Sequence, residues 1–241
     1  MEGMNGPGNV IEGTFLGANG QAVEIELKKW IPGKNGKKGQ FNAIDATYSD
    51  SKGHFQLQPQ RPLPMDFYQI MVNKTQAMVV IMDSTKHLTI EATLPDAGYI
   101  ANAEIKGFKA AQEVSDYYST AIPLQDLQNM LRTGMQQTKD PLKRQEMSDR
   151  SVKIQSEIKS WAKRFIEEHS GSPACLGPLE HLSIRPNMSI FKEVLKATQS
   201  TLSGGAYHKV LSDVVQGEEA KMRSGNNSRT VPKGNGANKP R

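Results

Sequence analysis

The spacing of hydrophobic residues changes near residue 107, and this change divides the chain into two regions. Before it, hydrophobic and polar residues alternate, as in strands with one buried face. After it, hydrophobic residues recur every three or four positions, as in helices with one buried face. We therefore expect a β domain at residues 10–106 and a helical region at residues 107–222, packed on or beside the β domain. Together they predict an α+β fold.

The β domain is predicted to contain short strands at regular spacing. They are expected at residues 10–16, 22–27, 43–48, 54–58, 67–72, 77–82, 87–92 and 99–105. The first two are expected to form a tight hairpin, because Asn19-Gly20 favours the positive φ angles of a two-residue turn. The third and fourth are expected to form a second hairpin. This spacing predicts an antiparallel β-sandwich or a partly open barrel.

The helical region is predicted to contain one long amphipathic helix. Its apolar stripe is formed by Ile154, Ile158, Trp161 and Phe165. Asp140-Pro141 is expected to begin this helix, because Asp caps free amides and proline at the first position loses no hydrogen bond. Further helices are expected at 108–121, 124–137, 173–182, 188–201 and 206–220, with Pro123 dividing or kinking the first two.

The net charge of +5 comes entirely from the end of the chain. Residues 223–241 hold five Lys and Arg and no acidic residue, and Val231 is their only bulky apolar side chain. We expect this segment to be a disordered basic tail and residues 1–9 to be a flexible lead. Because the basic residues are dispersed and lack aromatic neighbours, the sequence does not predict nucleic-acid binding. No apolar run is long enough to span a membrane, and the sequence as given has no signal peptide.

The residues that could carry chemistry are scattered. Cys175 is the only cysteine, which excludes an intrachain disulfide and a cysteine-based zinc cluster, and we expect it to be a small buried apolar residue. The histidines show no ligand pair at helical spacing. The sequence therefore predicts no catalytic residue, no metal and no cofactor, and we expect a protein that is not an enzyme.

One stretch of basic residues is a candidate binding surface. It comprises Lys28, Lys29, Trp30, Lys34, Lys37 and Lys38. The loop within it lacks the order of a phosphate-binding loop and is not followed by a helix, so a solvated hairpin loop is the better interpretation. The strand residues before it could still form an anion or ligand surface.

Several segments resemble a known family. They are residues 44–57, 67–70, 80–83, 88–90 and 103–107 in the β domain, and residues 165–174 and 206–211 in the helical region. They are similar to the β-rich N-terminal domain of unknown function that precedes thioredoxin-like or peroxiredoxin-like domains in envelope proteins of Bacteroidetes. The resemblance covers roughly residues 10 to 216.

The resemblance implies a place in the cell envelope or periplasm and a thioredoxin-like domain as the protein partner. Family members continue into a domain with a Trp-Cys-x-x-Cys motif, whereas this sequence continues into a polar tail. We therefore expect a non-catalytic accessory or positioning module of a thiol-disulfide oxidoreductase system. Two alternatives stay open: an independent module that binds a glycan, peptide or protein partner through residues 28–39, and a hydrolase with dispersed Asp, His and Ser residues.

Overall fold

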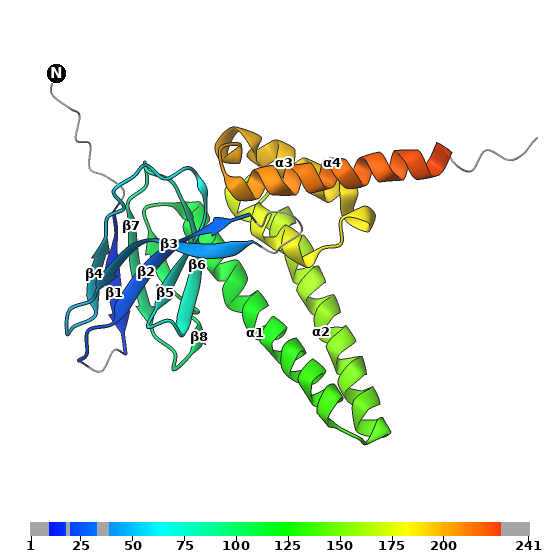
Figure 1. The fold of residues 1–241 in the computed structure, drawn as a ribbon, viewed down its shortest axis with the longest axis horizontal. Coiled ribbons are helices and arrows are strands. Elements are labelled where there is room, and N and C mark those ends of the chain that lie inside the picture. Colours follow the sequence, from blue (N-terminus) through cyan, green and yellow to red (C-terminus); the bar gives the residue numbers. More distant parts are fainter. Residues whose placement is uncertain (1–9, 18–19, 33–38, 228–241) are drawn as a thin grey trace, which may run out of the picture.

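In the computed structural model, which describes residues 10–17, 20–32 and 39–227, strands come first and helices follow (Figure 1). The strands are β1 (Ile11–Leu16), β2 (Glu24–Ile31), β3 (Gln40–Tyr48), β4 (His54–Leu57), β5 (Asp66–Val72), β6 (Gln76–Met82), β7 (Leu88–Thr93), β8 (Gly98–Tyr99) and β9 (Glu104–Lys106). The helices are α1 (Lys109–Gln137), α2 (Pro141–Glu168), the 3₁₀ helices η1 (Pro173–His181) and η2 (Arg185–Asn187), α3 (Met188–Leu202) and α4 (Ala206–Asn227). This arrangement confirms the α+β class. The predicted lead at residues 1–9 lies outside the described residues.

The strands form two open sheets, which agrees with a sandwich rather than a closed barrel. Sheet A has the order β4-β1-β7-β9, and sheet B has the order β3-β2-β5-β6-β8. Most strand pairs are antiparallel, as the sequence predicts, but β1 pairs with β7 and β6 pairs with β8 in parallel. Both sheets are therefore mixed.

Both predicted hairpins were wrong, because each joins strands of different sheets. β1 lies in sheet A and β2 in sheet B, and the same division separates β4 from β3. Each of these connections crosses from one sheet to the other. The tight hairpin is instead β5–β6, where Asn73 and Lys74 adopt φ angles of 48° and 61° and Thr75 N donates to Val72 O at 3.1 Å.

The core lies between the two sheets and continues on the outer side of sheet B. Phe15 of sheet A stacks on Phe55 with ring centroids 4.7 Å apart, and Ile25 and Leu27 of β2 are fully buried on the inner face of sheet B. On the other face, Trp30 and Phe67 contact Tyr207 of α4 at centroid distances of 5.5 and 5.1 Å. Sheet B is thus covered by sheet A on one side and by helices on the other (Figure 1).

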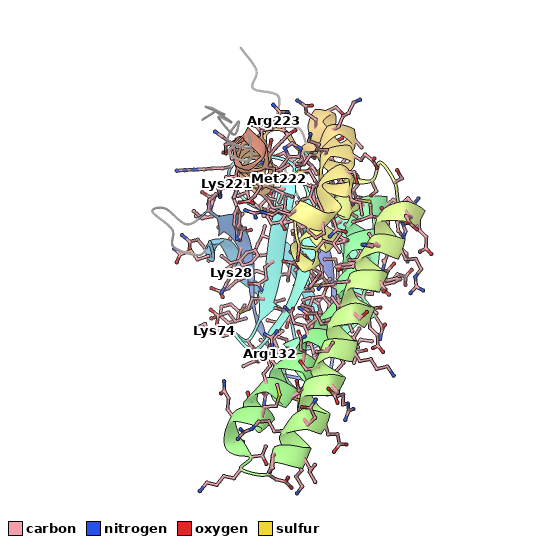
Figure 2. All side chains as sticks on the ribbon, turned by 90° about the vertical axis from the view of Figure 1, so that its right-hand side faces the viewer. Lys28, Lys74, Arg132, Lys221, Met222 and Arg223 are labelled. Carbon is pink, nitrogen blue, oxygen red and sulfur yellow. The ribbon has the colours of Figure 1, made fainter. Side chains whose placement is uncertain are left out.

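Helices α1 and α2 form a long hairpin whose far end projects beyond the sheets (Figures 1 and 2). We expected Pro123 to divide or kink this region, and α1 instead runs continuously through it. Pro123 is exposed, so the carbonyl that loses its main-chain donor can be hydrated. The first half of α1 packs against β6 and β9, and its buried Tyr117 packs on Trp161 and Phe165 of α2, so contacts on two sides hold the helix together across the proline.

Helix α2 begins as the sequence predicts, because Asp140 Oδ1 accepts a hydrogen bond from Leu142 N at 2.9 Å. Ile154, Ile158 and Phe165 of the predicted stripe are buried. Trp161 is only half-buried, since its ring lies at the margin of the contact and stacks on Tyr117 at 6.1 Å.

Helix α4 is attached to sheet B by a cap from a distant residue. Asp66 Oδ2 accepts a hydrogen bond from Ala206 N at 2.8 Å, so a carboxylate of β5 satisfies the start of α4. The helix continues to Asn227, past the predicted start of the tail at residue 223, and Arg223 Nη2 donates to Glu219 Oε1 at 2.8 Å. The rest of the predicted tail, residues 228–241, lies outside the described residues.

Candidate binding site

The structure divides the predicted basic surface between the two faces of β2. Lys29 follows Ile25 and Leu27 on the inner face, whereas Lys28 and Trp30 point to the outer face. Lys28 Nζ forms an ion pair with Glu26 Oε2 at 3.0 Å, and Trp30 packs edge-on against Tyr207. The three described residues therefore do not share one face of the strand, and the other three, Lys34, Lys37 and Lys38, lie outside the described residues.

Lys29 lines a cavity at the end of the sandwich where β4 connects to β5. The cavity has a volume of about 620 Å³ and is lined by Lys29, Ile44, Asp45, Pro59, Gln60, Arg61, Pro62, Leu63 and Pro64. Residues 59–64 cannot form a central strand because of their prolines, and they form instead the wall opposite Lys29. Tyr68 holds this wall in place, because its hydroxyl donates to Pro64 O at 2.7 Å.

The two charged groups Asp45 and Lys29 differ in the hydrogen bonds and ion pairs that they form. Both oxygens of the Asp45 carboxylate accept main-chain hydrogen bonds, Oδ1 from Ala46 N at 2.9 Å and Oδ2 from Gln58 N at 2.8 Å. Within the described part of the chain, Lys29 Nζ has no carboxylate at ion-pair distance, although it attracts the buried Asp66. The cavity thus combines apolar walls with a half-buried ammonium group, which suits an anionic or peptide-like ligand.

The lone thiol lies elsewhere, under the end of α2. Cys175 is buried, and its Sγ lies 3.0 Å from His169 O, to which the thiol donates. Burial and the nearby carboxylate of Glu113 raise the pKa of the Cys175 thiol to about 12. These surroundings favour the protonated, unreactive form, as the sequence analysis expected for a buried apolar residue.

We therefore predict that Cys175 reacts with a disulfide reagent such as Ellman's reagent at least about a hundredfold more slowly than a free thiol at pH 8. Addition of guanidinium chloride should release one reactive thiol per chain, because unfolding removes both causes of the raised pKa. The rate of absorbance change at 412 nm measures this, with the unfolded chain as the control. Rapid labelling of the folded chain would contradict a buried thiol.

Serine, histidine and a carboxylate also converge at one place, where α1 begins and α2 ends. Ser172 Oγ donates to Glu113 Oε2, while His169 Nδ1 and Lys109 Nζ each lie 3.2 Å from Glu113 Oε1. Ser172 also caps η1 by accepting from Ala174 N at 3.2 Å. In a catalytic triad the imidazole stands between serine and carboxylate, whereas here both groups bind the carboxylate. The arrangement instead links the start of α1, the end of α2 and the start of η1 through one carboxylate.

Glu113 should make the stability of the fold depend on pH. Burial alone would raise the pKa of its carboxyl, but hydrogen bonds from Ser172, Lys109 and His169 outweigh burial and hold the pKa below its ordinary value. The folded state therefore gains stability above the unfolded pKa of about 4.3, and loses it as the pH falls through the lower folded value.

We predict that Glu113→Gln lowers the free energy of unfolding by about 2 kcal/mol at pH 7, because the charged hydrogen bonds to a buried carboxylate are lost. The difference from the wild type should shrink as the pH falls below about 4.3 and through the lower pKa of the native carboxyl, because that carboxyl then becomes protonated as well. Urea unfolding at both pH values measures this. Glu168→Gln, an exposed change beside the same site, should have little effect at either pH.

Sequence reasoning missed the wall at residues 59–64 and the role of Glu113. The gap between the strands expected at residues 54–58 and 67–72 indicated a loop, but a loop's position against another sheet depends on contacts between residues far apart in the chain. The histidines showed no ligand pair in the sequence, and the structure adds the contact of His169 with Glu113. No local pattern connects Glu113 with Ser172, which lie 59 residues apart.

The described residues contain no group of three or more His, Cys, Asp or Glu side chains placed to hold a metal ion. None of the described helices is long and apolar enough to cross a membrane. Comparison of the chain with protein-family models, curated proteins and solved structures gives no match.

Proposed function

We propose that this chain is a non-catalytic binding module that holds a protein partner at the end of its sandwich where β4 connects to β5. Following the sequence resemblance, we propose a thioredoxin-like domain as the partner and the cell envelope as the compartment. In this role the chain positions the partner, and the partner supplies the reactive dithiol.

The cavity beside Lys29 is the observation that carries this proposal. Its prolines form apolar walls that are already rigid, so binding costs little conformational entropy there. The ammonium group of Lys29 favours a negatively charged segment. Two exposed apolar side chains lie in or beside it: Ile44 lines it, and Ile31 follows Lys29 on the same face of β2, whereas Phe41 pairs with Trp30 on the opposite face. Exposed apolar side chains beside a charged cavity favour a protein ligand over a small molecule, because a small molecule would leave them uncovered.

The surroundings of Cys175 support the non-catalytic part of the proposal. Thiol-disulfide exchange needs an accessible thiolate, and a second thiol to release the mixed disulfide efficiently. The buried thiol with its raised pKa meets neither need. The purified chain should therefore not accelerate reduction of insulin disulfides by dithiothreitol.

The test is a quantitative pull-down from cells that express the protein natively, analysed by mass spectrometry. Wild-type chain should retain a protein with a Cys-x-x-Cys motif, and the complex should reduce insulin. Lys29→Gln should lower the retained amount about tenfold, because it removes the cavity's ammonium group.

The matched control is Lys74→Gln, which removes a lysine at the β5–β6 turn (labelled in Figure 2) that does not line the cavity. It should leave retention unchanged. Insulin reduction by the isolated chain, or equal retention by wild type and Lys29→Gln, would overturn the proposal.

A further inference from the structure

Strand β3 is an exposed edge that leads directly into the cavity. It stands at the end of sheet B and, within the described part of the chain, pairs only with β2. It is nine residues long, contains no proline, and is exposed along Gln40–Ile44. Such an edge presents unpaired N–H and C=O groups that can bind another strand.

A β-bulge joins this edge to the cavity. Leu27 pairs with Asp45 and Lys28 pairs with Ala43, so Ile44 is the extra residue. In a regular strand Ile44 and Asp45 would point to opposite faces, but here both line the cavity. Gln58 N donates to Asp45 Oδ2 and so occupies one position beside the strand, whereas every residue of Gln40–Ile44 is exposed.

The side chains beside this edge define the chemistry of its ligand. Phe41 and Ile44 leave 37% and 38% of their surface exposed, which offers apolar contacts to a neighbouring strand. Lys29 and Arg61 bring positive charge to the cavity lining, and the carboxylate of Asp45, which also lines it, already accepts main-chain hydrogen bonds at both oxygens. The complementary ligand is an extended peptide with apolar residues and a carboxylate side chain.

We infer that an extended, acidic segment of the partner protein adds to sheet B as a strand alongside Gln40–Ile44 and places a carboxylate side chain in the cavity beside Lys29. This inference rests on the proposed function and specifies its binding mode. Main-chain hydrogen bonds to β3 provide affinity, and the cavity selects the side chain. At about 620 Å³ the cavity can hold side chains two positions apart, which point to the same face of a strand.

The test begins with a library of random 12-residue peptides displayed on phage and panned against the full chain. The tightest clone is synthesised, and its affinity is measured for wild type, Lys29→Gln and Lys74→Gln. We expect an acidic peptide that binds Lys29→Gln about tenfold more weakly and Lys74→Gln as well as wild type.

Backbone methylation of the peptide then tests strand pairing. Along an added strand, alternate N–H groups point toward β3 and the others toward solvent. N-methylation at one set of alternate positions should weaken binding more than about tenfold, and methylation at the other set should have little effect. Hydrogen exchange should slow at Gln40–Ile44 when the unmodified peptide binds.

The outcomes separate the two proposals. Peptides that depend on Lys29 but tolerate methylation at every position, without protection of β3, would overturn strand addition and leave the binding function standing. Recovery of no peptide that depends on Lys29 would overturn both. A chain that dimerises through β3 in sedimentation experiments would assign the edge to a second copy and so contradict a partner segment.

Discussion

Replacement of Phe165 by alanine is expected to lower the free energy of unfolding by about 3–5 kcal/mol. Phe165 is 1% exposed, and its ring packs against Tyr117 and His169 with centroids 5.0 and 4.2 Å apart. Removing it would leave a cavity where α1, α2 and the start of η1 meet, and these helices are too firmly packed to close it. Urea unfolding followed by circular dichroism measures the loss.

Two variants of the same helix provide the comparison. Trp161→Ala should cost less, about 2 kcal/mol, because that indole is only half-buried. Val152→Ala should cost less than about 0.5 kcal/mol, since Val152 is 64% exposed. If Phe165→Ala were no more destabilising than Val152→Ala, the packing of α2 described above would be incorrect.

Gly107→Ala is expected to be the other severe substitution, with a loss of at least about 3 kcal/mol. Gly107 connects β9 to the start of α1 with a φ angle of +99°, and an added Cβ would lie 1.8 Å from His87 O. The positive φ angle alone costs an alanine about 1–2 kcal/mol. The main-chain oxygen of His87 can move only if β7 and β9 separate, which adds the larger part of the cost.

Gly171→Ala is the matched control for Gly107→Ala. Gly171 has a similar φ angle of +86°, but its Cβ would meet no atom within 4 Å. It should therefore show only the conformational cost, about 1–2 kcal/mol. Melting temperatures of both variants would give the comparison, and equal losses would mean that the clash at Gly107 is relieved by a small movement.

Local pattern was sufficient to predict the elements but not their pairing. Alternation located the strands, and Asp140-Pro141 located the start of α2, because these signals depend on neighbouring residues. The hairpin across Asn19-Gly20 was wrong because β1 gains more by lying between β4 and β7 than by pairing with β2. A turn signal favours a local pairing, and burial of the whole strand can override it.

For the candidate site, too, the sequence indicated individual residues but not how they come together. Lys29 was identified with its neighbours as a basic surface, but strand alternation separates it from Lys28 and Trp30. The wall that completes its cavity comes from residues 59–64, on a segment that leads from sheet A back to sheet B. Only the three-dimensional packing of the two sheets brings these groups together.

The parallel pairing of β1 with β7 sets the order in which the protein can fold. Ile11 pairs with Leu88, so sheet A is completed by two strands that lie 77 residues apart in the sequence. During synthesis the first strand must remain unpaired on this side until β7 has left the ribosome, whereas the β5–β6 hairpin can form at once. Contacts between distant segments slow folding, and we expect refolding in milliseconds to seconds rather than microseconds. Until then β1 keeps an unpaired edge on that side, which favours transient association with another chain.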